Sequence, residues 1–496
     1  MSATRPVDVT SDSEHPLELA PEVFERWTLE VAAWLREALP ALTEGSASGV
    51  TGGPAWERAA ALSPPVAEAP LHGGLEATLA VLGQLSRLAL NTTGPGYLAY
   101  VPGGGIPASA LAQLIAASLN RFTGLAAAAP GFARLEHNVL TWLAAELGYD
   151  QRARGLFTTG GSMANFSAVV TARHHHLGDD GDYRGASLYM TAQAHRCVGK
   201  AARLAGLPSS ALREVAVDAA LRMDPRRLDA AVRADRAAGR RPFLVVASAG
   251  TTNTGAIDPL DEIADVCAAH GLWLHVDGAY GGCFALCEAG RLRLGHLSRA
   301  DSIAIDPHKG LFLPYGLGAL FVREGERLRA AHAETAAYLQ DLSEPQPLEV
   351  PSPSDLGPEL SREYRGLRLW LPLMLHGAAP FREAAAEKLD LARRFREAIR
   401  PLPVEVPVEP ELSVVAFRLP RLPGEDLGHW NARNRALLRG INRRDRVFLS
   451  STTLPAEDGD AVTLRICVLC YRTHAEQIDR CVEDLSAALA DPDVTG

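Results

Sequence analysis

The sequence predicts an α/β protein in which a mostly parallel β-sheet forms a large domain, with an N-terminal helical segment before it and a small α+β domain after it. Two observations predict the sheet. Short apolar segments between residues 188 and 322 alternate with helical stretches such as residues 258–270. These segments are apolar throughout, which is typical of parallel strands that helices cover on both faces.

Size and composition allow this architecture. The chain has 496 residues, of which 47% are hydrophobic, and a formal net charge of −10. Its basic runs are short, so nucleic acid is not an expected partner. No apolar run reaches the ~18 residues of a membrane span, and the polar start lacks the pattern of a secretory signal. We therefore expect a cytoplasmic protein with neither a membrane nor a nucleic-acid partner.

The seven cysteines are expected to be buried free thiols. Their number is odd, and the close pairs Cys283/Cys287 and Cys467/Cys470 lack a matching quartet of His and Cys ligands. Both facts favour a reducing compartment over disulfides or zinc. The sequence therefore predicts no metal site.

The N-terminal segment, residues 1–95, is expected to be helical. Apolar residues recur at helical spacing over residues 21–39 and 75–90. The Gly-, Ser- and Thr-rich residues 45–54 between them are typical of a loop.

The large domain, residues 96–380, is expected to contain the sheet. Its strands are expected at residues 188–191, 243–248, 272–276, 302–305 and 318–322. Parallel strands place their carboxyl ends along one edge of the sheet, and ligands bind beyond that edge. We therefore expect the functional site in the loops that follow these strands.

The small domain, residues 381–496, is expected to begin with a helix at 381–399 and to end with one at 474–489. Strands are expected between them, at residues 413–418, 446–450 and 462–469. The proline-rich residues 344–358 precede this domain. They are expected to be an exposed loop, either a mobile active-site loop or a plain connector.

An amine and a carboxylate are expected at two strand ends. Lys309 follows the strand at residues 302–305, and Asp277 follows the strand at residues 272–276. Burial lowers the pKa of an amine, so Lys309 could form a Schiff base with an aldehyde. Pyridoxal 5′-phosphate (PLP) requires both groups, a lysine for its aldehyde and a carboxylate that keeps its pyridine nitrogen protonated. The pair predicts a PLP site; alternatively, Asp277 caps a helix and Lys309 is solvated.

Other polar residues also follow strands. Gly161 and Ser162 precede a helical run and could bind a phosphate through backbone N–H groups and a hydroxyl, although glycines can also serve a tight turn alone. His195 could stack on a flat ring. His308 could contact the phosphate or the imine, or it could be a packed core imidazole.

Residues 248–259 are expected to form a loop that a ligand can approach. The loop is rich in small and hydroxyl-bearing residues, including Thr251 and Thr252. Asp258, near its end, is expected to cap the helix that follows.

These motifs follow the order found in the PLP-dependent group II amino-acid decarboxylases, the fold-type-I family that includes aromatic L-amino-acid decarboxylase and glutamate decarboxylase. The chain resembles this family from about Pro95 to the C-terminus, which implies a seven-stranded large domain. The resemblance rests on GPGYLAYVP at 94–102, Gly161-Ser162, Ala194-His195, Gly250-Thr251-Thr252, HVDGAY at 275–280 and DPHK at 306–309.

The resemblance implies that Lys309, Asp277 and His195 are catalytic. Lys309 would bind the cofactor as an imine, Asp277 would pair with the pyridine nitrogen, and His195 would stack on the ring. Ala279 would pack on the opposite ring face, and Thr252 would lie near the ring. Residues implied for the phosphate are Gly161, Ser162, Asp306 and His308. Residues implied for the substrate side, where they favour an apolar or aromatic side chain, are Tyr97, Tyr100 and Val101.

The family likeness also implies a homodimer with its active site at the subunit interface and an N-terminal segment that wraps the partner. The implied reaction converts an L-amino acid to an amine and CO2. Alternatives with the same cofactor are an aminotransferase, a carbon–carbon lyase or a PLP-binding protein without catalysis.

One region departs from the family pattern. The resembled decarboxylases carry a proton-donating tyrosine on a mobile loop after the lysine, whereas residues 339–363 contain none, and Tyr338 and Tyr364 only flank them. In relatives that lack this tyrosine, dioxygen can react instead, which yields an aldehyde, ammonia and peroxide. We expect decarboxylation with another acid, and an oxygen-dependent aldehyde synthase is the alternative.

Overall fold

A computed structural model describes residues 15, 17–48, 53–179, 181–334, 350–491 and 494. The chain forms two compact units, Met1–Gly94 and Pro95–Gly496. The expected division of the second unit at residue 380 stays a prediction.

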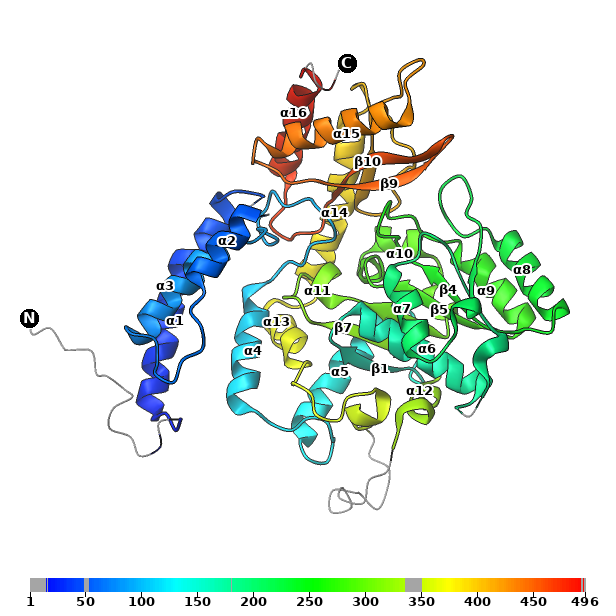
Figure 1. Ribbon diagram of the computed structural model, residues 1–496. Helices are drawn as coiled ribbons and strands as arrows, with labels where there is room; N and C mark the ends of the chain where they lie inside the picture. The colour runs from blue at the N-terminus through cyan, green and yellow to red at the C-terminus, as the bar shows by residue number, and fades with distance from the viewer. Residues whose placement is uncertain are drawn as a thin grey trace, which may run out of the picture. The chain divides into compact units, whose positions relative to one another are not determined.

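The first unit consists of helices, as expected: α1 (Pro21–Glu44), α2 (Gly53–Leu62) and α3 (Gly74–Ser86) (Figure 1). Helix α2 has no counterpart in the sequence prediction. The side-chain amide of Asn91 donates a hydrogen bond to the Leu42 carbonyl at 2.9 Å, which ties the residues after α3 to the last turn of α1.

The second unit contains a seven-stranded sheet. Its strands are β1 (Arg154–Thr158), β2 (Ala186–Met190), β3 (Leu212–Glu214), β4 (Arg241–Ser248), β5 (Trp273–Gly278), β6 (Ser302–Ile305) and β7 (Gly318–Val322). Their order is β1-β7-β6-β5-β4-β2-β3, and β7 is antiparallel to both of its neighbours. All other neighbouring strands are parallel, so the predicted mostly parallel sheet is confirmed. The edge strands β1 and β3 are short and were not expected.

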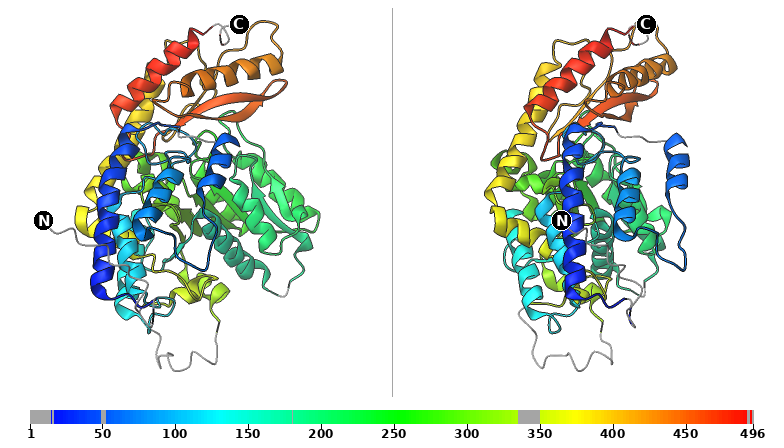
Figure 2. Two further views of the ribbon diagram at one scale, coloured as in Figure 1. Left: turned by 60° about the vertical axis from the view of Figure 1, so that its left-hand side comes forward. Right: turned by 90° about the vertical axis from the view of Figure 1, so that its left-hand side faces the viewer.

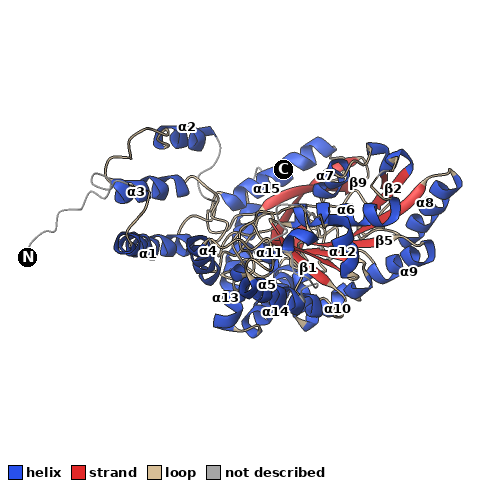
Figure 3. Ribbon diagram, turned by 90° about the horizontal axis from the view of Figure 1, so that it is seen from below, coloured by secondary structure: helices blue, strands red, loops and turns tan. Residues whose placement is uncertain are grey.

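Helices cover both faces of this sheet, which explains why its strands are apolar throughout (Figure 3). One core joins the sheet to Ala168 of α6, Val198 of α7 and Leu328 of α12. A second core, on the opposite face, contains side chains of α5, α8, α9 and α14. Alternate residues of a strand belong to different cores, as Leu244 and Val245 of β4 show.

The helices of this region have the following bounds: α4 (Pro107–Leu119), α5 (Pro130–Glu146), α6 (Gly161–Leu177), α7 (Arg196–Leu204), α8 (Pro225–Ala237), α9 (Leu260–His270), α10 (Glu288–Leu294), α11 (Pro307–Gly310), α12 (Gly325–His332) and α13 (Leu367–His376). Among the described helices, none combines the length and apolar character that crossing a lipid bilayer requires.

The C-terminal region is α+β, as expected. It contains α14 (Ala379–Ala398), α15 (Leu427–Asn442) and α16 (Ala475–Leu489), which Figure 2 shows beside a small sheet. The antiparallel strands of that sheet are ordered β8 (Val414–Phe417), β10 (Gly459–Cys467), β9 (Ser450–Ala456). Buried side chains from all three helices, such as Phe395, Leu437 and Ile478, share one core with the strands.

The expected strand at residues 446–450 is wrong. Strand β9 begins only at Ser450, and before it Phe448 makes an isolated bridge with Tyr97. The Phe448 N–H donates to the Gly96 carbonyl at 2.9 Å, so the apolar residues before β9 pair with a distant segment of the chain and not with β10.

The expectation of an exposed proline-rich loop at 344–358 is wrong for its described part. Residues 335–349 lie outside the described residues. Leu356 is 4% exposed and shares a core with Leu156 of β1. An apolar contact therefore holds this segment against the edge of the sheet.

Candidate active site

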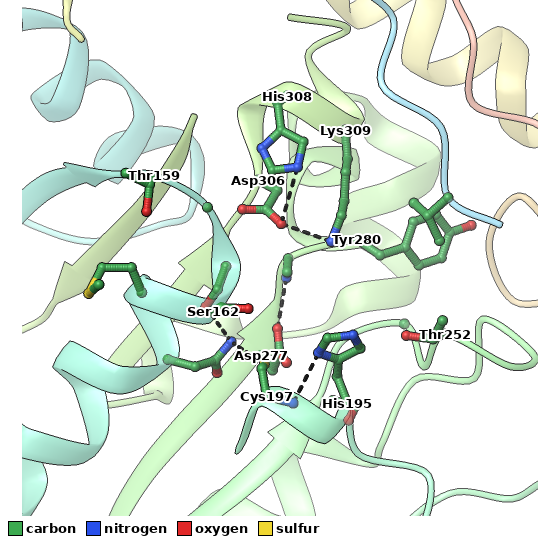
Figure 4. Close-up of a pocket in the computed structure, with 18 of the residues that line it drawn as sticks. Thr159, Ser162, His195, Cys197, Thr252, Asp277, Tyr280, Asp306, His308 and Lys309 are labelled. Carbon is green, nitrogen blue, oxygen red and sulfur yellow. Dashed lines mark hydrogen bonds and ion pairs between the residues drawn. The ribbon is translucent and has the colours of Figure 1, made fainter. Parts of the chain in front are cut away.

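A cavity of about 470 Å³ opens beyond the carboxyl ends of β4, β5 and β6. Its volume lies in the range of small-ligand sites. It brings together all nine residues expected to bind the cofactor, from Gly161 to Lys309, and also Val101. Figure 4 shows Lys309 and Asp277 pointing into the same space from two separate segments. Tyr97 and Tyr100 are not among the residues that line it.

Lys309 is held by an ion pair. It lies in the short helix α11, directly after β6, and its Nζ is 2.8 Å from Oδ2 of Asp306. Burial by itself would lower the pKa of Lys309, but the charges of Asp306 and Asp277 and the hydrogen bond to Asp306 outweigh it and raise the pKa. The expected lowered pKa is therefore wrong for the protein alone, because two carboxylates accompany the buried amine.

Asp277 is positioned by strand register. It lies in β5 opposite Ser248 of β4 and Ala304 of β6, and it is 7% exposed. Its Oδ1 accepts the N–H of Ala279 at 3.1 Å. That single bond leaves carboxylate lone pairs for a protonated ring nitrogen in the cavity.

His195 occupies the N-terminus of α7. Its Nδ1 accepts the Cys197 N–H at 3.3 Å, so the ring serves as the N-cap of the helix. In the neutral ring this bond leaves the proton on Nε2. The ring itself is exposed along the cavity, where it could cover a flat ligand.

The turn before α6 is shaped for an anion. Gly160 has φ = 151°, which favours glycine, and a Cβ on Gly161 would lie 2.9 Å from Oδ2 of Asp306 and 3.0 Å from the Ala279 methyl. The free N–H groups of the first turn of α6 can then bind a phosphate. The amine, the carboxylate, the imidazole and this turn are the groups that PLP requires, so the residues fit the cofactor.

The ionised carboxylate of Asp306 accepts hydrogen bonds and has none to donate to a phosphate. Its Oδ2 faces Lys309 and, at 3.8 Å, the Nε2 of His308, while its buried Oδ1 has no hydrogen-bond partner among the described residues. His308 Nδ1 donates to the Leu317 carbonyl at 2.7 Å, and burial lowers the pKa of this imidazole. Asp306 therefore holds Lys309 in place, a role that differs from the expected phosphate contact.

An ordered chain of buried hydrogen bonds supports the turn, and the sequence reasoning missed it. Asn165 Nδ2 donates to the Gly161 carbonyl at 2.8 Å, so its Oδ1 accepts from His275 Nε2, also at 2.8 Å. His275 Nδ1 must then accept from the Ser302 hydroxyl, at 2.8 Å, whose oxygen accepts the Trp273 indole N–H.

The chain of bonds links the turn of α6 to the strand that carries Asp277. Burial lowers the pKa of His275 to about 4, so the ring is neutral and the direction of every bond holds near neutral pH. A sequence signal existed: Trp273, His275 and Asp277 alternate along β5 and must share one face of the sheet.

Asp258 has a different partner from the expected one. It does not cap α9, whose N-cap is Pro259. Its buried carboxylate accepts the N–H groups of Met223 and Ser248, each at 2.7 Å, and burial raises its pKa to about 6. Asp258 thus fixes the end of β4, where the residues that line the cavity begin.

The three residues expected on the substrate side lie in different environments. Val101 lines the cavity. Tyr97 is buried against Phe448, at 5.8 Å between ring centroids. Tyr100 is 56% exposed and adopts a left-handed conformation with φ = 51°.

Arg465, which the sequence reasoning also missed, lies near this side of the site. It is 3% exposed, and its Nη1 donates to Ser450 Oγ at 3.1 Å. The same hydroxyl oxygen accepts the Tyr100 N–H. Nε and Nη2 of Arg465 have no hydrogen-bond partner in the described part of the chain. A buried cation with free donors is suited to an anionic group.

The cysteines are all described. All seven are buried, and none of them forms a disulfide. Cys197 lines the cavity, but burial raises its pKa to about 12, so it is a neutral thiol. Across the described ranges, no three His, Cys, Asp or Glu side chains are grouped so that they could hold a metal ion.

Substitution of Asn165 should weaken cofactor binding. Asn165→Ala leaves the N–H of His275 unpaired and frees the Gly161 carbonyl, a loss of about 1–3 kcal/mol. We expect the Kd of the apoprotein for PLP to rise about 5- to 150-fold, measured by absorbance titration. Thr171→Ala is the matched control, since this buried residue of α6 bonds to Ser167 and to His332 of α12, neither of which lines the cavity. Equal Kd values for the two variants would contradict the role of the chain.

Comparison with known proteins gives the family. The model of the pyridoxal-dependent decarboxylase conserved domain matches residues 88–420. The chain is 34% identical over 387 residues to the aromatic-L-amino-acid decarboxylase of Bacillus atrophaeus, covering 77% of this chain and 79% of that protein. It is 33% identical over 341 residues to the human cysteine sulfinic acid decarboxylase, covering 67% and 68% of the two chains.

Solved structures share the fold. A crystal structure of Oryza sativa TDC with PLP and tryptamine has a TM-score of 0.85 at 24% identity and covers 95% of this chain and 98% of its own. Mouse CSAD in apo form has a TM-score of 0.84 at 26% identity, covering 95% and 99%. The family match, together with the amine, carboxylate and anion-binding turn in one cavity, shows that the chain belongs to the pyridoxal-dependent decarboxylases, lyases that remove the carboxyl group of an amino acid with PLP as cofactor.

Proposed function

We propose that this decarboxylase acts on an aromatic or other apolar L-amino acid and releases the amine and CO2. The observation that carries the proposal is the convergence of Lys309 and Asp277 on one cavity. Among the described residues that line it, Lys309 is the one Lys or Arg, and the proposal gives Lys309 to the cofactor and the nearby Arg465 to the α-carboxylate, which leaves neither for an acidic side chain. The relative from Bacillus atrophaeus acts on aromatic amino acids and supports the same choice.

The residues divide the work as follows. Lys309 would hold the cofactor aldehyde, and Asp306 holds the Nζ of Lys309 in place. Asp277 would keep a proton on the ring nitrogen, while His195 and Ala279 would cover the ring and exclude water. When bound, PLP supplies an electron sink for the pair that departing CO2 leaves behind.

The substrate carboxylate needs a cation that is not engaged elsewhere. Arg465 is close enough to influence the pKa of Tyr280, a residue that lines the cavity, and it has free donors. We propose that its guanidinium attracts the α-carboxylate and helps to orient the bond that breaks.

An oxygen-dependent aldehyde synthase is the second candidate, and one observation favours it. Residues 339–363 contain no tyrosine. Tyr338 lies outside the described residues, and Tyr364 is 6% exposed and donates its proton to the Phe132 carbonyl at 3.1 Å. Tyr364 is therefore buried and is not among the residues that line the cavity.

Product analysis separates these reactions. We expect the holoenzyme, given a panel of L-amino acids in air, to release CO2 and one equivalent of amine from an aromatic or apolar substrate. Peroxide and aldehyde equal to the CO2 would establish the synthase instead. A keto acid without CO2 would overturn both, and preference for an acidic amino acid would overturn the proposed substrate class.

Lys309→Ala should abolish covalent cofactor binding. The imine of a lysine and PLP is yellow. Borohydride reduces this imine to a secondary amine, so that the cofactor stays attached to the lysine after denaturation. We expect the variant to be colourless and to retain no cofactor after reduction and denaturation. Lys200→Ala, an exposed lysine of α7, serves as the control and should remain yellow. Covalent cofactor in Lys309→Ala would contradict the assignment.

We propose that the enzyme is a homodimer with its active site at the subunit interface. Helix α4 supports this. Its inner face buries Ala108 and Ala112, but Leu111, Leu114 and Ile115 are 42–55% exposed at helical spacing. A continuous exposed apolar stripe on a helix is typical of an interface.

We propose the reducing cytoplasm as the location of the enzyme, because all seven cysteines are buried and none forms a disulfide.

Charges on this stripe should separate the subunits. For Leu114→Glu/Ile115→Glu we expect a monomer by analytical ultracentrifugation, because the charges would lose their hydration in an apolar interface. Leu292→Glu, at a lone exposed leucine of α10 that is 79% exposed, should leave the dimer intact. A dimer in both variants would show that α4 is not the interface.

A further inference from the structure

The side chain of Asn253 joins three segments of the chain that are remote in sequence. It lies in the loop after β4, next to Thr252, which lines the cavity. Its Nδ2 donates to Oε1 of Gln193 at 3.0 Å, and its Oδ1 accepts the hydroxyl proton of Thr452 at 2.8 Å. One amide therefore ties the loop after β4 to the loop after β2 and to strand β9 of the small sheet.

The loop that carries Asn253 is held by its own backbone hydrogen bonds. Ala249 and Ile257 form an isolated β-bridge at its base. Nearer the tip, the Thr251 N–H donates to the Ala256 carbonyl at 2.9 Å. Asn253 lies between these two partners, so the loop keeps the amide in a fixed position relative to the end of β4.

The first arm of the amide leads to His195. Gln193 lies in the turn between β2 and α7, where the Thr191 hydroxyl accepts the Gln193 N–H at 3.2 Å and the Thr191 carbonyl accepts the Ala194 N–H at 3.1 Å. His195 follows directly, caps α7 and lines the cavity. Figure 4 shows His195 and Thr252 on the same side of that cavity. The bond to Gln193 thus restrains the turn that carries the imidazole expected to cover the cofactor ring.

The second arm leads to the substrate side. Thr452 and Ser450 alternate along β9 and therefore share one face of that strand. Oγ of Ser450 accepts from Nη1 of Arg465 at 3.1 Å and from the Tyr100 N–H at 3.0 Å. The same face of β9 thus contacts the arginine proposed for the α-carboxylate and, through Asn253, both loops on the cofactor side.

We propose that Asn253 is a positioning residue for decarboxylation, which fixes the spacing between the imidazole that covers the cofactor and the strand that holds Arg465. The arm toward the substrate rests on the proposed role of Arg465, and the arm toward His195 does not. An asparagine suits the position because its amide donates on one side and accepts on the other. The bond that breaks must be aligned with the cofactor ring, so a small displacement of the carboxylate slows the release of CO2.

Thr452→Val tests the arm toward the substrate, since it removes the hydroxyl and keeps the shape of the side chain. We expect kcat to fall about tenfold or more, within the roughly 10²-fold that a misplacement of 1 Å can cost. KM should change less, because the carboxylate is still bound but is misaligned. Thr453→Val is the matched control: it makes the same change at the exposed neighbour on the opposite face of β9 and should leave kcat unchanged.

Thr452→Ser distinguishes positioning from a plain loss of stability. The serine keeps the hydroxyl, so we expect it to retain wild-type kcat. Valine is among the residues enriched in strands and serine is not, so a purely structural effect would make the serine variant the weaker one. A loss of kcat in Thr452→Ser without a loss in Thr452→Val would overturn the positioning role.

Asn253→Leu removes both arms at similar volume, and Gln193→Leu removes the arm toward His195 alone. In both variants we expect the Kd of the apoprotein for PLP to rise about 2- to 12-fold, the equivalent of one lost hydrogen bond. Amide hydrogen exchange of the apoprotein is a measurement independent of turnover. The Cys197 amide, which His195 caps, should exchange faster in both variants and at the wild-type rate in Thr452→Val.

The outcomes separate the two arms from each other and from the function on which one of them rests. Wild-type kcat in Thr452→Val would overturn the arm toward the substrate. Unchanged Cys197 exchange and Kd in Asn253→Leu would overturn the arm toward His195. Wild-type kcat and KM in Arg465→Lys would overturn the proposed role of that arginine, while the effect of Asn253 on PLP binding would stand.

Discussion

The alignment of three strand ends governs the site. Ser248 of β4 lies opposite Asp277 of β5, and Asp277 lies opposite Ala304 of β6. Because parallel strands are spaced at about 4.8 Å, this register brings the loop after β4, the carboxylate and the turn of Lys309 to one edge. A slip by one residue would turn Asp277 to the other face of the sheet.

Charges that share the site determine its protonation more than burial does. Lys309 is surrounded by protein, yet Asp306 and Asp277 keep its pKa above the usual value. His275 has only a distant carboxylate to oppose burial, and its pKa falls to about 4. Two neighbouring segments, α11 and β5, therefore hold a charged amine and a neutral imidazole, and the neutral ring can relay hydrogen bonds in one direction only.

The substrate side is built from segments that are remote in sequence. Ser450 of β9 binds both Tyr100 and Arg465, and Gly103 binds Tyr315, whose turn Arg368 holds. Each contact joins residues that lie outside the seven-stranded sheet. The sheet thus positions the residues that fit the cofactor, while these outer contacts connect segments that lie beyond it.

The sequence by itself determined the α/β class and most strands, and it predicted the polar residues that line the cavity, because apolar strands and their first polar neighbours are adjacent in the chain. Strands β6 and β7 begin and end at the expected residues. Local pattern could not reveal β3, which has three residues at a sheet edge, nor the pairing of Phe448 with Tyr97.

Only the tertiary structure decided how the polar groups are paired. It assigned Asp258 to the end of β4, Asp306 to Lys309 and Asn165 to His275. It also placed Arg368 of α13 against the turn that carries Tyr315, although nothing in their spacing marks them. The physical reason is that a buried polar group takes whichever partner the fold brings within hydrogen-bond reach, and that partner can be more than a hundred residues away.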